Sequence, residues 1–379
     1  MKSMKPLLAG LVSAAVLVAC GGGDDSVDFS SMVSFGDSLS DVGTYKVGTV
    51  AQLGGGKFTI NGTDGKVWTD YLADAVGEAA PCAARTGMLP NLAGITGAPV
   101  TDIAACTNYA QGSSRVTSSG TGPNGVGLQV YGQQNLGFMA DSLKDQMTRH
   151  LAKIGGTYGG RELVTVNAGG NDLFMQLNGL GSAAGGGQAA AVGATIAGWS
   201  PATVTTVTAG GANGVNAAGA AAVTAMGQAG AELAGYVKTL VVAKGAQYIV
   251  IRNLADVNYT PFGLTLDSGT RGLITSMTQA FNGQLASGLS GTNGVVVLDD
   301  YAQSAAVAAN PASYGYSNVI GVACGNNAFG GSSIVCTTAN LIAGNTSAYA
   351  FADSVHPTPY AHQKEAVVAL DGMAKVGWR

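Results

Sequence analysis

Residues 32–41 read Met-Val-Ser-Phe-Gly-Asp-Ser-Leu-Ser-Asp. The mostly apolar run 32–35 directly precedes a Gly-Asp-Ser turn, so we expect a short buried strand that ends just before Ser38. In parallel sheets, ligands collect outside the carboxyl ends of the strands. Ser38 therefore stands where chemistry is expected.

Three further runs of the same kind follow along the chain. Strands are expected at 32–35, 163–167, 248–252 and 295–298. Helices are expected at 67–76, 136–154, 273–289 and 359–375, where apolar residues recur every three or four positions. Buried strands that alternate with amphipathic helices predict a parallel sheet covered by helices.

A second informative segment lies near the C-terminus, where residues 353–358 read Asp-Ser-Val-His-Pro-Thr. The spacing lets one loop present His356 with Asp353 behind it. With Ser38, these residues supply the nucleophile, base and carboxylate that acyl transfer through a covalent ester requires. We expect Ser38 to attack an ester carbonyl and His356 to carry the proton, while Asp353 fixes the imidazole tautomer.

Four segments, in order, resemble the signature blocks of the GDSL, or SGNH, family of serine esterases and lipases: 36–41, 108–112, 169–172 and 353–356. The resemblance extends over about residues 31–370. It implies a three-layer α/β/α sandwich with a central parallel sheet, the flavodoxin-like SGNH hydrolase fold. It also implies that Ser38 N–H, Gly112 N–H and the Asn171 amide stabilise the oxyanion. Ser113-Ser114 replace the usual Gly-Ala, which leaves the second donor open by one position.

Each catalytic candidate has a structural alternative. Ser38 could cap a helix, Asp353 could be a turn residue, and His356 could be an ordinary loop histidine. The occurrence of all four segments in family order favours the catalytic interpretation. Other polar residues are interpreted as structural: Asp37, Asp41, His150 and His362.

The N-terminus predicts export. Lys2 and Lys5 precede the apolar stretch 6–19, which is too short to span a membrane. This pattern is typical of a secretory signal peptide, here over 1–19.

Residues 17–20, Leu-Val-Ala-Cys, resemble the processing site of bacterial lipoproteins. Cys20 is then the expected lipidated first residue of the mature chain, with ordinary cleavage as the alternative. The polar segment 20–30 is expected to be a flexible tether. By resemblance to lipoprotein sorting patterns, Gly21 after the cysteine favours the outer membrane. We expect an exported protein that is lipid-anchored there, facing the periplasm or the surface, or released from the membrane.

The cysteines agree with export. Five occur in the chain, and without Cys20 an even number remains, which predicts two disulfides in an oxidising compartment. Three pairings are possible, and we expect the local pairs Cys82–Cys106 and Cys324–Cys336. Zinc is the alternative, but the chain has no Cys-x-x-Cys and only three histidines. No metal or other cofactor is expected.

Composition limits the class of protein. The 379 residues, 46% of them hydrophobic, can bury a substantial core. We expect a single domain over 31–379, although the length would also permit two. Loss of Lys2 and Lys5 takes the formal charge from −4 to about −6, and no basic cluster occurs. Nucleic-acid binding is therefore not expected.

The middle of the chain is unusual because residues 173–231 contain no Asp, Glu, Lys or Arg. We expect 178–230 to be a Gly/Ala-rich insertion of surface loops and Ala-rich helix. A lid or a flap that contacts the acyl group is the alternative. No unbroken apolar run is long enough for a transmembrane helix.

These observations predict a carboxylic ester hydrolase whose partner is an acyl ester substrate. A carbohydrate O-deacetylase or an acyltransferase could use the same site. A lipid-tethered binding module with a vestigial site is a further alternative. The acyl length, the alcohol and the oligomeric state stay open.

Overall fold

The computed structural model describes residues 26–88, 94–117 and 140–379. The predicted signal peptide, Cys20 and half of the predicted tether lie outside these residues. The central sheet is parallel, with the order β1-β4-β5-β6. Its strands are β1 Ser31–Gly36, β4 Glu162–Asn167, β5 Tyr248–Arg252 and β6 Val295–Leu298. All four predicted strands are confirmed, with β1 and β4 each one residue longer at the start and β1 also one longer at the end.

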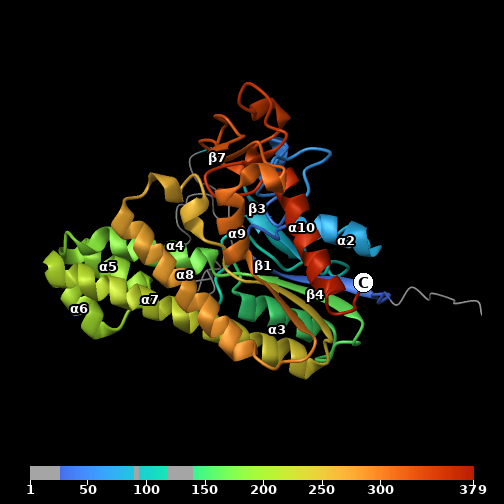
Figure 1. Ribbon diagram of the computed structural model, residues 1–379, viewed down its shortest axis with the longest axis horizontal. Coiled ribbons are helices and arrows are strands. Elements are labelled where there is room, and N and C mark those ends of the chain that lie inside the picture. Colours follow the sequence, from blue (N-terminus) through green and yellow to red (C-terminus); the bar gives the residue numbers. More distant parts are fainter. Residues whose placement is uncertain (1–25, 89–93, 118–139) are drawn as a thin grey trace, which may run out of the picture.

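Helices cover both faces of this sheet (Figure 1). On one face, Met32, Leu163 and Val250 pack against α2 Trp68–Val76 and α10 Pro359–Ala374. On the other face, alternate strand residues such as Val33 and Val164 pack against the helices α3 Leu143–Lys153, α7 Gly211–Tyr236 and α8 Ser268–Leu289. The two-residue period of the strands explains this division. The expected three-layer α/β/α sandwich is confirmed.

Capping residues decide where two of the expected helices begin. The Asp267 carboxylate accepts the N–H groups of Gly269 and Thr270, so α8 starts five residues before the predicted 273. Ser142 accepts the Asp145 N–H and starts α3 at Leu143. The predicted start at 136 falls outside the described residues, and residues 140–142 are not helical.

The uncharged segment is mostly helical rather than looped. It contains α4 Gly170–Ala183, α5 Gly187–Ile196, α6 Pro201–Ala209 and most of α7. These helices form a lobe that projects from the sheet (Figure 1). Its threonine hydroxyls donate to carbonyls one turn earlier, as Thr205 does to Pro201, so the lobe's surface hydroxyls need no charged partners.

The remaining elements are short. They are α1 Gly48–Gln52, β2 Arg85–Met88, β3 Ala98–Asp102, α9 Asp300–Ala309, β7 Asn318–Val322 and β8 Tyr349–Phe351. The predicted disulfides Cys82–Cys106 and Cys324–Cys336 are confirmed. None of the helices in the described ranges is long and apolar enough to cross a membrane. The same ranges contain no group of three or more His, Cys, Asp or Glu side chains that could hold a metal ion.

The two ends of the described chain meet at the amino edge of the sheet. Val27 N–H donates to the Trp378 carbonyl at 3.1 Å. The Trp378 ring packs edge-on against Tyr248, the first residue of β5, with ring centroids 5.2 Å apart. The carboxyl edge, where Ser38 lies, is therefore at the opposite end of the strands.

The close contact between α7 and α8 gives a stability prediction. A Cβ atom at Gly230 would collide with the Phe281 carbonyl oxygen, whereas a Cβ at Gly235 would meet nothing within 4 Å. We expect Gly230→Ala to lower the free energy of unfolding by about 1–3 kcal/mol, because the two helices must separate. The matched Gly235→Ala should be neutral or stabilising by up to about 1 kcal/mol, because alanine favours the helix. Urea denaturation of both variants checks this, and equal stabilities would contradict it.

Candidate active site

The catalytic candidates converge at the carboxyl edge of the sheet. Ser38 lies in the turn after β1, which closes when Asp37 accepts the Leu39 N–H on its side chain and the Ser40 N–H on its carbonyl. Ser38 Oγ lies 3.0 Å from His356 Nε2. His356 Nδ1 lies 2.9 Å from each carboxylate oxygen of Asp353. Three residues far apart in sequence thus form one hydrogen-bonded chain.

The Asp353 carboxylate is buried but well supplied with donors. Its Oδ1 accepts the His356 N–H and its Oδ2 accepts the Ser333 N–H, both at 2.8 Å. Burial alone would raise the pKa of Asp353, but the adjacent His356 and these donors hold that pKa well below its usual range. Asp353 is therefore ionised at neutral pH and accepts the Nδ1 proton, which leaves Nε2 free to accept the Ser38 hydroxyl.

The structure does not bring the Gly112 N–H to the site. That group donates to Asp41 Oδ2 at 2.8 Å instead. Gly112 is small for a packing reason, because a Cβ there would collide with the Phe58 ring. The neighbouring Ser113 lines the cavity and has a φ of 82°, the one positive value among the described non-glycine residues. Within the described ranges the Ser113 N–H has no hydrogen-bond partner.

Asn171 lies in the first turn of α4 and also lines the cavity. One N–H of its amide donates to the Ser114 carbonyl at 2.9 Å, which leaves the second N–H available. The adjacent Asp172 has a different role, since it accepts the Val116 N–H at 3.0 Å and pairs with Arg115. Burial raises the pKa of Asp172 despite this pairing. Asp172 thus fixes the segment after Ser114 to α4.

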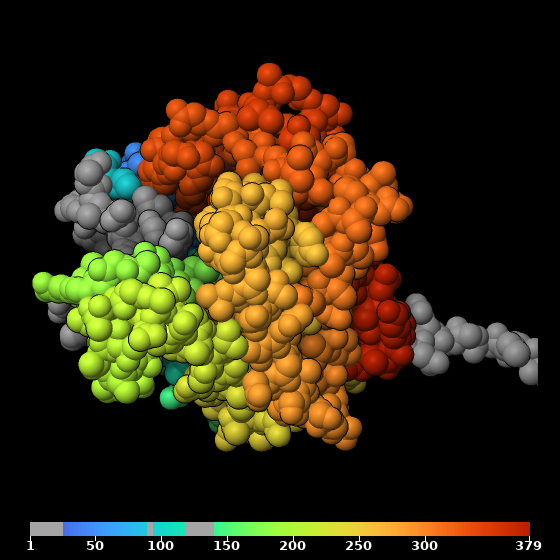
Figure 2. Space-filling model, turned by 60° about the vertical axis from the view of Figure 1, so that its left-hand side comes forward, coloured from blue at the N-terminus to red at the C-terminus, as the bar shows by residue number. Residues whose placement is uncertain are grey.

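These groups open into a cavity of about 950 Å³. Its walls are built from 252–262, α9 and the loop closed by the Cys324–Cys336 disulfide. Figure 2 shows the molecule hollowed between the amber residues, which include 252–262, and the orange-red residues above them, which include the loop closed by the disulfide. Of the helices in the uncharged lobe, α4 alone contributes described lining residues, which include Asn171 and Phe174.

Sequence reasoning missed two contacts that complete the site. The Phe58 ring packs against the His356 ring with centroids 5.0 Å apart. Ser333 supplies a backbone donor to Asp353, for which no side-chain pattern exists. The sequence did give a signal at Ser113, because a serine stands there where the family that the chain resembles has glycine.

Comparison with known proteins identifies the family of this chain. No curated protein matches the chain. A family model described as GDSL-like Lipase/Acylhydrolase matches residues 32–366. The match starts within β1, ends within α10 and includes every element that carries a side chain of the site. The chain therefore belongs to the GDSL-like lipase/acylhydrolase family of hydrolases.

Proposed function

We propose that the protein is a carboxylic ester hydrolase that works through an acyl-enzyme on Ser38. The observation that carries this proposal is the hydrogen-bonded chain from Ser38 Oγ through His356 to Asp353, with distances of 3.0 and 2.9 Å. Membership of a lipase and acylhydrolase family supports the reaction class. The cavity next to Ser38 provides room for an ester substrate.

The first half of the reaction forms the acyl-enzyme. Ser38 Oγ attacks the ester carbonyl carbon while its proton passes to His356 Nε2, and the carbonyl electrons move onto the oxyanion. When the tetrahedral intermediate collapses, the bond to the alcohol oxygen breaks and His356 returns the proton to that oxygen. Asp353 stays ionised and stabilises the imidazolium throughout.

The second half releases the acid. A water molecule gives its proton to His356 Nε2 and attacks the acyl carbon, and collapse returns a proton to Ser38 Oγ. In both halves, negative charge develops on the same oxygen. Its proposed donors are the N–H groups of Ser38 and Ser113 and the free N–H of the Asn171 amide. Ser113 takes the place expected for Gly112, because the Gly112 N–H is already bound to Asp41.

The nucleophile is tested first. We expect Ser38→Ala to lower kcat by about 10³-fold or more while the protein stays folded. A fluorophosphonate probe should label the wild type at Ser38 and leave the variant unlabelled. Ser347→Ala changes an exposed serine outside the cavity and should label like the wild type. A Ser38→Ala protein that retains a tenth of the wild-type kcat would exclude this nucleophile.

The role of Asp353 links activity to pH. Asp353→Asn keeps the shape but not the charge, so kcat should fall by about 10³–10⁴-fold. The folded-state pKa of Asp353 is depressed, so its stabilising effect is complete above the unfolded-state pKa of about 3.9 and is lost as pH falls further. The stability gap between wild type and Asp353→Asn should therefore be larger at pH 7 than at pH 3 in urea denaturation. Asp299→Asn, at an exposed helix cap, is the control; a pH-independent gap would contradict the assignment.

The Asn171 amide is expected to act on the transition state only. Asn171→Ala should lower kcat by about 10²–10³-fold with little change in KM. Asp172→Ala, one residue further, should mainly lower stability because it leaves the partly buried Arg115 without its ion-pair partner. Steady-state kinetics and thermal melts separate the two effects. An Asn171→Ala enzyme with kcat within about threefold of wild type would remove Asn171 from the oxyanion site.

A further inference from the structure

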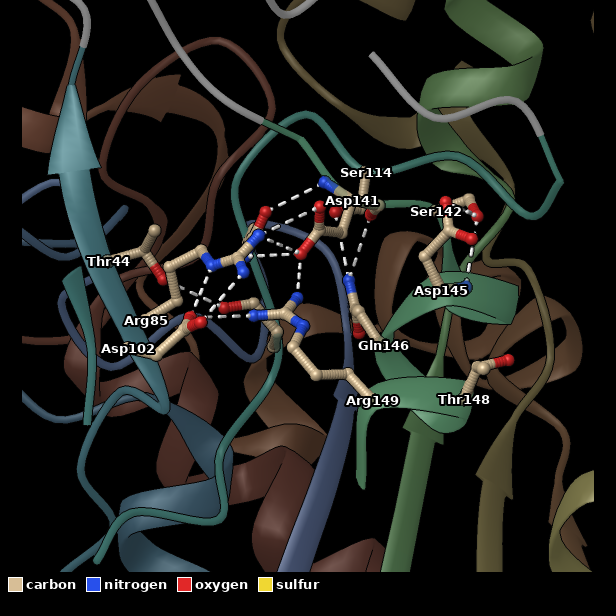
Figure 3. A network of polar contacts seen from close by, with 12 residues as sticks. Thr44, Arg85, Asp102, Ser114, Asp141, Ser142, Asp145, Gln146, Thr148 and Arg149 are labelled. Atoms are coloured by element: carbon tan, nitrogen blue, oxygen red, sulfur yellow. Dashed lines mark hydrogen bonds and ion pairs between the residues drawn. The ribbon is translucent and has the colours of Figure 1, made fainter. Parts of the chain in front are cut away.

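The side chain of Gln146 connects two parts of the site that are distant in sequence. We call residues 36–40 the nucleophile turn and residues 111–114 the oxyanion loop. Gln146 lies on α3 and is completely buried, at 0% exposure. Gly36 N–H donates to its Oε1 at 2.9 Å, and its Nε2 donates to the Gly36 carbonyl at 2.9 Å. The same Nε2 donates to Ser114 Oγ at 3.0 Å (Figure 3). If the amide were flipped, its NH₂ group would face the Gly36 N–H and its oxygen would face the Gly36 carbonyl. Neither pair can form a hydrogen bond, so the orientation is fixed.

Both partners of Gln146 adjoin the proposed oxyanion donors. Gly36 precedes Ser38 by two residues, and Ser114 directly follows Ser113. The Ser114 carbonyl also accepts the Asn171 amide at 2.9 Å. Gln146 is absent from the cavity lining and touches none of the proposed reacting atoms. The Gln146 amide thus binds residues that are at most two positions from Ser38 and Ser113 in the sequence. Through Ser114 it is also linked to Asn171.

The surrounding charges hold α3 against the oxyanion loop. Asp141, just before α3, donates its N–H to Gln111 Oε1 at 2.8 Å and accepts from Gln111 Nε2 at 3.3 Å. Arg85 and Arg149 both pair with the buried Asp141 carboxylate (Figure 3). Arg149 lies three residues beyond Gln146 on the same helix. The amide of Gln146 is therefore held by its own hydrogen bonds and by the contacts that fix α3. It has little freedom to move.

We propose that Gln146 is a positioning residue that sets the separation between the Ser38 and Ser113 N–H groups and, through Ser114, the orientation of the Asn171 amide. The inference rests on the proposed function, because it concerns the same oxyanion. Donors stabilise the developing charge only when they lie about 2.7–3.1 Å from it. A displacement of about 1 Å can cost about 10²-fold in rate. Loss of the Gln146 amide should therefore weaken transition-state binding rather than substrate binding.

The test compares Gln146→Met with the matched control Gln176→Met. Gln176 is also a buried glutamine with two hydrogen bonds, from Trp199 Nε1 and to the Ala197 carbonyl, but these lie in the uncharged lobe. Both variants should lower Tm, because each leaves buried polar groups unpaired. Gln146→Met alone should lower kcat by about 10²-fold with KM within about threefold. Its inhibition constant for a boronic acid, a tetrahedral analogue, should rise by the same factor as kcat/KM falls.

Two further variants keep the test decisive. Gln146→Glu is the conservative change, since a buried protonated carboxyl can accept once and donate once, and it should recover part of the lost kcat. If Gln146→Met does not fold, Ser114→Ala removes only the contact with the oxyanion loop. It should lower kcat by about 3–10-fold, as expected for one hydrogen bond of about 1 kcal/mol, with little change in Tm.

The outcomes separate this proposal from the proposed function. A folded Gln146→Met, or in its place Ser114→Ala, that keeps the wild-type kcat and boronic-acid affinity would overturn the role of Gln146 alone. A wild-type protein that neither hydrolyses esters nor reacts with fluorophosphonate at Ser38 would overturn the ester hydrolase and, with it, the positioning role.

Discussion

The parallel pairing of β1 with β4 is the constraint on which the site depends. In this register Gly36 lies opposite Asn167, and Asn167 lies opposite Arg252 on β5. The strands therefore end at a common edge, with Ser38 two residues and Asn171 four residues beyond it. Because strand side chains alternate, a slip by one residue would exchange the two sets of β1 side chains that pack against the two helical layers. The hydrophobic packing on both faces of the sheet excludes that slip.

The proposed base, His356, comes from a part of the chain that the sheet does not position. Thr59 Oγ1 donates to the Pro357 carbonyl at 2.9 Å across 298 positions of sequence. Asn61 Nδ2 donates to the Ser333 carbonyl at 3.0 Å. The segment from Phe58 to Asn61 thus ties the His356 loop to the disulfide-closed loop that supports Asp353. The geometry of the candidate site depends on these long-range contacts as well as on strand register.

Local sequence patterns were sufficient for the strands, and together with the resemblance to the family they indicated the three residues that meet at the cavity. Each of these depends on short-range chemistry, either an apolar run with a following turn or a carboxylate three residues before an imidazole. The choice between Gly112 and Ser113 could not be made in this way, because it depends on the buried Asp41 carboxylate and on the backbone angle at Ser113. Both are consequences of tertiary packing.

The extent of helix in the uncharged lobe was underestimated for a different reason. Its helices carry few large apolar residues, so the usual helical spacing is hard to detect. The helices are stabilised by close packing of one helix on another. For example, Gly230 of α7 lies against the Phe281 backbone of α8. The starts of α3 and α8 were missed because single capping side chains, Ser142 and Asp267, decide them.

The junction of Val27 with Trp378 has a consequence for immobilised protein. Both ends of the described chain lie at the amino edge of the sheet, about a strand length from the edge where Ser38 lies, which for six residues is roughly 20 Å. A bead, a fusion partner or a bilayer joined directly at Val27 or Trp378 would hold that pole toward the support. The cavity would then face the bulk phase. The cavity of the immobilised protein would then meet dissolved molecules that diffuse to it, and not molecules embedded in the support.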